Sequence, residues 1–168
     1  GECEIAKKCL ILDLDETLAF RSKTRLESTS FEVQIPAYGT TVTRYITVRP
    51  GVPEFLKAVE PHFHVHIFTA GYETYADAVI DQIDPNQMIQ KRLYNDSCDP
   101  LGNGYYQKDP TKISSDLSAT VVVDDDPDTF RHDANGIWVE PFDCESDPDD
   151  SELCALSEFL LNMKDVPE

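Results

Sequence analysis

The chain has 168 residues, 40% of them hydrophobic, and 32 acidic side chains against 14 lysines and arginines give a formal net charge of −18. This length predicts one domain, and the charge argues against direct nucleic-acid binding, which needs a basic surface. No apolar run approaches the roughly 20 residues that cross a bilayer. The five scattered cysteines form no Cys-x-x-Cys pair, so a reducing, intracellular compartment is predicted, nuclear or cytoplasmic.

The predicted elements alternate between strands and helices. The first strand covers residues 9–14, and residues 21–49 then alternate polar and apolar side chains around Tyr38-Gly39, which predicts a β-hairpin insertion. Further strands are predicted over 63–68, 119–123 and 136–139, helices over 53–59, 72–83 and 152–163, and a short β ribbon around 99–104. This order indicates an α/β domain over residues 1–168, with a mostly parallel sheet covered on both faces.

The first predicted strand ends in two carboxylates, Asp13 and Asp15, one residue apart. Alternate residues of a strand share a face, so we expect both side chains to lie on the same side. Like charges repel and ionised carboxylates resist burial, so the pair indicates use by a cation or a reaction. Thr69 and the pair Asp124-Asp125 follow two other strands. The carboxyl ends of parallel strands meet at one edge of a sheet, where ligands bind.

Carboxylates from two strand ends can hold a hard cation, and oxygen ligands favour Mg²⁺. A lysine ammonium and a threonine hydroxyl at the same edge would complete a site for a phosphoryl group, because both stabilise its oxygens. Thr69 is the candidate hydroxyl and Lys108 the candidate ammonium. The sequence therefore predicts Mg²⁺-assisted phosphoryl chemistry.

Seven stretches give the sequence a specific resemblance. They are Leu12–Leu18, Arg49–Leu56, Ile67–Ala70, Tyr75–Asp77, Asp96–Cys98, Tyr106–Asp109 and Val123–Pro127. Their order resembles the haloacid-dehalogenase (HAD) superfamily, and more narrowly its small RNA polymerase II C-terminal-domain phosphatases, the FCP/SCP or NLI-interacting-factor group. The hairpin insertion is also similar to that group's. The resemblance implies a Rossmann-like parallel sheet flanked by helices, with the insertion after the first strand.

The resemblance implies a role for each strand-end acid. Asp13 would be the nucleophile and would form an aspartyl-phosphate. Asp15 would protonate the departing serine or threonine oxygen and then activate water. The implied metal ligands are Asp13, the backbone carbonyl of Asp15, Asp124 directly, and Asp125 directly or through water.

The resemblance also implies a substrate site. Thr69 would donate a hydrogen bond to the phosphoryl group, and Lys108 would pair with that group and with Asp13. The predicted substrate contacts further include Ala70, Tyr72 and Arg49. The implied substrate is a phosphoserine or phosphothreonine peptide or protein, with the polymerase C-terminal repeat as prototype.

Other interpretations remain open at this point. The chain could be a phosphatase of another phosphoprotein or small phosphoester, or a catalytically silent binding module of the same fold. Asn95 stands where the small phosphatases commonly have arginine, and Lys23 where relatives often present an aromatic side chain. Both differences bear on substrate choice rather than on the chemistry.

Three histidines and two tyrosines are open to two interpretations. His62, His64 and His66 alternate like metal ligands, but in a sheet covered on both faces we expect packed or hydrogen-bonded histidines. Tyr75 lies about one turn after Tyr72, so these tyrosines are either ordinary helix-face aromatics or the floor of a substrate groove. Trp138 is predicted to lie in the core.

Overall fold

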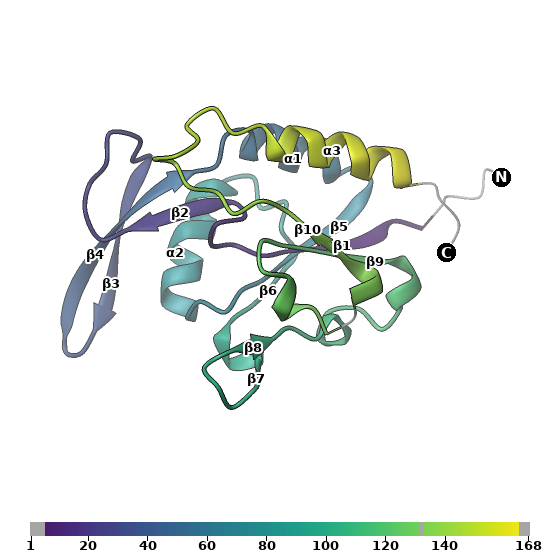
Figure 1. The fold of residues 1–168 in the computed structure, drawn as a ribbon, viewed down its shortest axis with the longest axis horizontal. Helices are drawn as coiled ribbons and strands as arrows, with labels where there is room; N and C mark the ends of the chain where they lie inside the picture. Colours follow the sequence, from purple (N-terminus) through teal and green to yellow (C-terminus); the bar gives the residue numbers. More distant parts are fainter. Residues whose placement is uncertain (1–5, 132, 165–168) are drawn as a thin grey trace.

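A five-stranded sheet forms the centre of the part of the chain that the computed structural model describes, residues 6–131 and 133–164 (Figure 1). Its strands lie in the order β10-β9-β1-β5-β6, and all neighbours are parallel. Their bounds are β1 Lys8–Leu12, β5 Phe63–Phe68, β6 Lys91–Leu93, β9 Thr120–Asp124 and β10 Gly136–Trp138. Every residue of β9 is buried, as expected for a parallel sheet covered on both faces. The predicted α/β fold is confirmed.

Three α-helices cover one face of this sheet. They are α1 Val52–Val59, α2 Glu73–Ile83 and α3 Glu152–Met163. In α1 the buried residues follow the spacing of one helix face (Val52, Phe55, Leu56 and Val59). The buried side chains of the three helices pack with those of β1, β5 and β9 in one apolar cluster, and α1 lies beside α3 (Figure 1).

Loops cover the second face, and the loops at and around the sheet contain single 3₁₀ turns. The turns are η1 Asn95–Ser97, η2 Pro110–Lys112, η3 Leu117–Ala119, η4 Pro127–Thr129 and η5 Asp133–Asn135. Here Ile11, Phe68 and Val122 of the sheet form a smaller apolar cluster with Cys98. A short antiparallel ribbon, β7 Asp99–Pro100 with β8 Tyr106–Gln107, also lies in this part of the chain and was predicted.

The insertion after β1 is a three-stranded antiparallel sheet in the order β2-β4-β3, which projects beside α2 (Figure 1). Its strands are β2 Ala19–Ser22, β3 Phe31–Ala37 and β4 Thr40–Val48. The predicted hairpin is confirmed, and both Tyr38 and Gly39 at its tip have positive φ angles, 51° and 76°, as a two-residue hairpin turn requires. The prediction missed β2 and β6 because four and three residues are too few to show a periodicity.

None of the helices in the described ranges has the length and apolar character needed to cross a membrane.

Candidate active site

The carboxyl ends of β1 and β9 bring two aspartates side by side. The parallel register places Leu12 beside Val123, and the Asp13 N–H continues the pairing by donating to the Val123 carbonyl at 2.9 Å. Asp13 therefore lies next to Asp124, the last residue of β9. Both carboxylates are buried, with residue exposures of 7% and 1%.

The ammonium of Lys108 lies between these carboxylates. Its Nζ is 2.8 Å from Asp13 Oδ1 and 2.7 Å from Asp124 Oδ2. The backbone N–H of Lys108 donates to the Thr129 carbonyl at 3.0 Å. The Thr129 hydroxyl lies 3.0 Å from Asp124 Oδ2 and 2.9 Å from the Asp126 carbonyl, and it can donate to only one of them at a time. Lys108 comes from a loop far along the chain, yet its main chain and its side chain are both fixed at this edge.

A third carboxylate completes a set that can hold a metal ion. One carboxylate oxygen from each of Asp13, Asp124 and Asp125 lies within 4.8 Å of the other two. The Thr17 hydroxyl lies 3.1 Å from Asp13 Oδ2 and 3.3 Å from Asp125 Oδ1, and it can donate to only one at a time. Three ionised carboxylates against the single ammonium of Lys108 leave about two negative charges in a largely buried place. All-oxygen donors and this charge fit a divalent hard cation such as Mg²⁺.

The titration of these groups reflects the same excess of negative charge. Burial raises the pKa of Asp13 to about 6, against the opposing charge of Lys108. Burial and then the charge of Asp13 raise the pKa of Asp124 to about 6, and burial raises that of Asp125. Burial alone would lower the pKa of Lys108, but its two aspartates outweigh that effect and raise it. The lysine therefore stays charged.

Asp15 has different partners from Asp13. The Tyr75 hydroxyl donates to Asp15 Oδ1 at 2.5 Å. Burial raises the pKa of Asp15, while the Tyr75 hydrogen bond and the charge of Arg21 oppose that rise. The predicted strand 9–14 ends at Leu12, and Glu16 takes a left-handed φ of 63°, so strand alternation does not describe Asp15. The two aspartates have separate partners rather than one common set.

Thr69 follows β5 and is almost fully buried. Its Oγ1 accepts a hydrogen bond from the Gly71 N–H at 3.0 Å, which leaves its own hydrogen free to be donated. A Cβ on Gly71 would lie 3.2 Å from Thr69 Oγ1 and 3.6 Å from Asp15 Oδ2. Glycine therefore keeps the space between these two side chains open. Ala70 and Tyr72 are exposed at the same loop.

Comparison with known proteins agrees with this geometry. The family description "NLI interacting factor-like phosphatase" matches residues 8–168. The chain belongs to this family. It is 35% identical, over 96% of its length and 53% of the relative's, to a "Probable C-terminal domain small phosphatase" of Dictyostelium discoideum. It is 34% identical, over 94% of its length and 59% of the relative's, to the human "Carboxy-terminal domain RNA polymerase II polypeptide A small phosphatase 2".

A solved structure of Fcp1, described as an essential RNA polymerase II CTD phosphatase, matches with a TM-score of 0.70 and 25% identity. The match covers 95% of this chain and 51% of that one. The chain thus spans about half the length of the relatives it matches. The predicted resemblance and the HAD-like fold are confirmed for this member of the NLI interacting factor-like phosphatase family.

The prediction that Arg49 contacts substrate needs correction. Its guanidinium is buried, at 1% residue exposure, and forms two hydrogen bonds of 2.8 Å with Asp150. Its other N–H groups donate to the carbonyls of Glu16, Thr17 and Glu140. These five bonds use all five donors of an arginine, so Arg49 fixes the loop behind the site and has no donor left for a phosphate.

Other side chains of the site were missed by sequence reasoning. Thr17 lies inside the stretch Leu12–Leu18, so the sequence motif itself could have indicated its contact with Asp13. Thr129 had none, because its contact with Asp124 depends on the η4 turn. Trp138 is not in the core: it is 49% exposed, and its indole N–H donates to the Asp125 carbonyl at 2.9 Å. That bond fixes the backbone of one candidate metal ligand.

The histidines on and beside β5 do not form a metal set among the described residues. His64 Nδ1 shares a hydrogen bond with Gln90 at 3.0 Å. His66 is buried, and burial lowers its pKa to about 4. His64 is thus hydrogen-bonded and His66 is packed, with its Nδ1 lacking a partner in the described part of the chain, as expected for one or the other state, whereas His62 is exposed.

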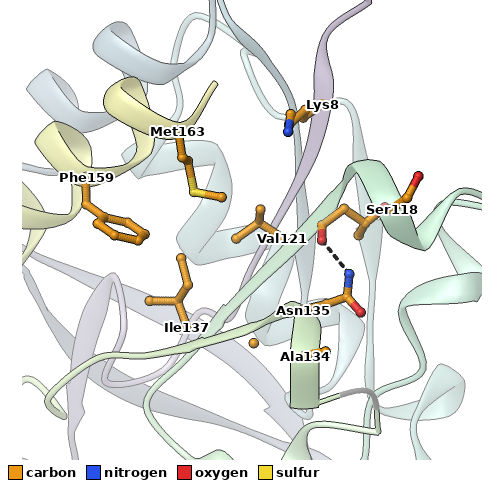
Figure 2. A pocket seen from close by; sticks show the side chains of 10 residues that line it. Lys8, Ser118, Val121, Ala134, Asn135, Ile137, Phe159 and Met163 are labelled. Atoms are coloured by element: carbon orange, nitrogen blue, oxygen red, sulfur yellow. Dashed lines mark hydrogen bonds between the residues drawn. The ribbon is translucent and has the colours of Figure 1, made fainter. Parts of the chain in front are cut away.

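A cavity of about 370 Å³ lies at the opposite end of the sheet, where β1 and β9 begin (Figure 2). Val121, Ile137, Phe159 and Met163 supply much of its wall, and Asn135 donates to the Thr120 carbonyl at 2.8 Å. Its ten lining residues include no carboxylate, histidine or cysteine. The candidate catalytic side chains therefore lie at the carboxyl edge and do not line this cavity.

Proposed function

We propose that this chain is a Mg²⁺-dependent phosphoserine/phosphothreonine protein phosphatase that works through an aspartyl-phosphate on Asp13. The observation that carries the proposal is the position of Lys108, with its ammonium between Asp13 and Asp124 beside a third carboxylate, Asp125. The family membership supports it, since relatives at 34–35% identity are named as C-terminal-domain small phosphatases.

Asp13, Asp124 and Asp125 would hold the metal ion, together with the Asp15 carbonyl implied by the resemblance. When bound, Mg²⁺ would neutralise phosphate charge and keep the carboxylates ionised. Within the chain's own residues, Lys108 favours the ionised form of Asp13 that a nucleophile needs. Its third N–H is free to contact a phosphoryl oxygen, and so is the hydroxyl hydrogen of Thr69.

In the first step an Asp13 oxygen would form a bond to phosphorus while the bond from phosphorus to the serine or threonine oxygen breaks. Asp15 would give its proton to that leaving oxygen. Burial raises the pKa of Asp15, which favours a protonated form. In the second step a water oxygen would attack phosphorus, its proton would pass to Asp15, and Asp13 would be released with inorganic phosphate. Both aspartates are thereby restored to their starting states.

Initial rates with a generic aryl phosphate test the chemistry. We expect Mg²⁺-dependent turnover by the wild-type chain, and a loss of about 10³-fold or more in Asp13→Asn, because an amide cannot act as the nucleophile. A matched control is Asp128→Asn, which removes the same charge from an exposed residue of η4. Turnover that survives in Asp13→Asn would falsify the assignment of Asp13 as the nucleophile. Absence of Mg²⁺-dependent turnover from the wild type would instead favour a silent binding module.

The substrate is addressed by comparing phosphoserine peptides with small phosphoesters. We expect peptides to have the higher kcat/KM, because the insertion stands beside the loop of Thr69 and can contact residues on either side of the phosphate. The printed names of the relatives make an RNA polymerase II C-terminal repeat peptide the first one to test. Equal kcat/KM for a small phosphoester and for every peptide would instead support a small-molecule phosphatase.

A further inference from the structure

A cavity of about 490 Å³ adjoins the candidate active site between the insertion and α2. Tyr75, whose hydroxyl bonds Asp15, is one of its lining residues. Arg21 and Arg44 of the insertion and Tyr72 at the start of α2 also line it. A substrate whose phosphate lies beside Asp15 would therefore place a neighbouring residue in this cavity.

The strand register explains why two arginines lie there. Arg21 of β2 is opposite Ile46 of β4, and Arg44 of β4 is opposite Val33 of β3. Residues 44 and 46 are two apart on one strand, so Arg21 and Arg44 are diagonal neighbours on the same face of the sheet. Val33 and Ile46 are buried on that face. The arginines thus continue the inner face of the insertion toward its rim.

Arg21 and Arg44 differ in their ion pairing from the other arginines in the described part of the chain. Arg25, Arg49, Arg92 and Arg131 each form an ion pair with a carboxylate. Arg21 and Arg44 form none within 4.0 Å, although the sequence carries 32 acidic residues against 14 basic ones. The Arg21 guanidinium instead stacks over the ring of Tyr75, 4.9 Å from its centroid, and Arg44 donates only to its neighbouring carbonyl, that of Thr43.

We propose that this cavity binds a second anionic group of the substrate, either the carboxylate of an acidic residue or a second phosphate, through Arg21 and Arg44. The inference rests on the phosphatase function proposed above and names its substrate class: phosphopeptides with a negative charge next to the phosphorylated residue. Arginine is the side chain suited to carboxylate and phosphate oxygens, because its planar N–H groups bond two oxygens at once. The stacking on Tyr75 holds one of the two guanidinium groups in place without using its hydrogen-bond donors.

The overall charge of the chain makes this local arrangement selective. A net charge of −18 repels anionic peptides from most of the surface. An acidic peptide gains from binding only where positive charge is concentrated and is not already neutralised. The two unpaired arginines, together with Lys108 at the phosphate position, would give such a peptide two points of attachment that fix its direction across the site.

The test compares a phosphoserine peptide of neutral sequence with versions that carry glutamate, or a second phosphoserine, at successive positions on either side. We expect one or more positions at which the added charge raises wild-type kcat/KM about tenfold, as one charge-assisted hydrogen bond would. The gain should shrink as salt is raised. A gain in kcat/KM with either glutamate or the second phosphoserine supports the anionic site. Comparing the two peptide series identifies which anion the site prefers.

Arg44→Gln is the decisive variant, because Arg21 also acts on Asp15 and its loss would alter the hydrolysis of every substrate. The readout is the ratio of kcat/KM for the charged and neutral peptides, which we expect to fall close to one in Arg44→Gln. Arg25→Gln is the matched control and should keep the wild-type ratio. Its guanidinium pairs with Glu32 and stacks on Tyr45, whose side chain points to the opposite face of β4.

Two results would overturn the inference: a ratio near one at all positions in the wild type, or an unchanged ratio in Arg44→Gln. Either result, with the neutral peptide still hydrolysed, leaves the proposed function standing. If no peptide or aryl phosphate is hydrolysed, the proposed function fails. Fluorescence anisotropy with the same labelled peptides then tests the site by binding: anionic peptides should bind the wild type about tenfold more tightly than Arg44→Gln, and equal affinities would reject it.

Discussion

Two buried groups of charged side chains lie close together in this fold, and they differ in how far their charges are balanced. At the carboxyl edge of the sheet, one ammonium bonds two carboxylates, and a third carboxylate lies beside them. Behind the loop that follows, the Arg49 guanidinium faces one carboxylate, that of Asp150, and three carbonyls. The Arg49 group is neutral and all its donors are used. The Lys108 group keeps excess negative charge and unused donors.

The difference separates a structural ion pair from a chemical site. Burying a charge is costly unless it is paired and hydrogen-bonded, so a saturated pair such as Arg49–Asp150 is stable by itself. Three neighbouring carboxylates with only one lysine among them are stable only with a further cation or with a bound proton. Burial alone therefore does not mark a candidate site, whereas unbalanced charge does, and the raised pKa values of Asp13 and Asp124 agree with it.

The largest effect is expected when the group of Asp13, Asp124 and Asp125 loses the ammonium of Lys108. Lys108→Met should lower turnover about 10³-fold, since it removes the ammonium from both the nucleophile and the phosphate. It should also lower the free energy of unfolding by about 3–5 kcal/mol, as when one partner of a buried pair is removed. Initial rates and urea unfolding measure the two effects. Lys112→Met, at a surface pair with Asp99, is the control, and wild-type turnover in Lys108→Met would refute the site.

Disrupting the balanced Arg49–Asp150 group should lower stability without changing the rate of catalysis. Asp150→Asn should lower the free energy of unfolding by about 3 kcal/mol, because it leaves the Arg49 charge buried without a counterion. The rate per folded molecule should stay within about threefold of wild type. Asp147→Asn, at an exposed residue three positions before Asp150, is the control. A selective loss of kcat in a fully folded Asp150→Asn would instead support the predicted role of Arg49 at the substrate site.

The pH dependence of the same variant has a definite sign. Burial would raise the pKa of Asp150, but its bonds to Arg49 and the charge of Arg49 together lower it. A lowered carboxyl pKa contributes stability above the ordinary carboxyl range and loses it as pH falls through the folded-state value. The stability difference between wild type and Asp150→Asn should therefore be full near neutral pH and shrink below about pH 4.

Sequence reasoning found the acids, Thr69 and Lys108 because each stands at a strand end or in a recognisable stretch. It could not separate Arg49 from a phosphate ligand, since the distinction depends on Asp150, about a hundred residues away, and on carbonyls of other loops. It missed β2 and β6, whose pairing is decided by their neighbours rather than by their own few residues. Tyr75 was noticed as an aromatic, but its bond to Asp15 depends on how α2 packs against the first loop.

Stabilisation by the metal ion is the smallest of these expected effects. It directly tests the excess negative charge of the Lys108 group. Mg²⁺ at about a hundred times its Kd should raise the free energy of unfolding by about 2.7 kcal/mol, measured at pH 7.5 as a rise in Tm. The rise should be smaller at pH 5, because the pKa values of Asp13 and Asp124 are about 6 and protons then compete for the carboxylates.

Without the ion, the dependence of stability on pH has the opposite sign. A raised carboxyl pKa means that the folded state holds its proton more tightly than the unfolded chain does, so the stability contributed by Asp13 and Asp124 should fall as pH rises from about 4 toward 6. Asp124→Asn removes one candidate ligand and one of the excess charges. In this variant Mg²⁺ should no longer raise the Tm, and stability without the ion should fall less as pH rises. If Mg²⁺ raised the Tm of wild type and Asp124→Asn equally at both pH values, the ion would be bound elsewhere, and the excess charge at this edge would need protons rather than a metal to balance it.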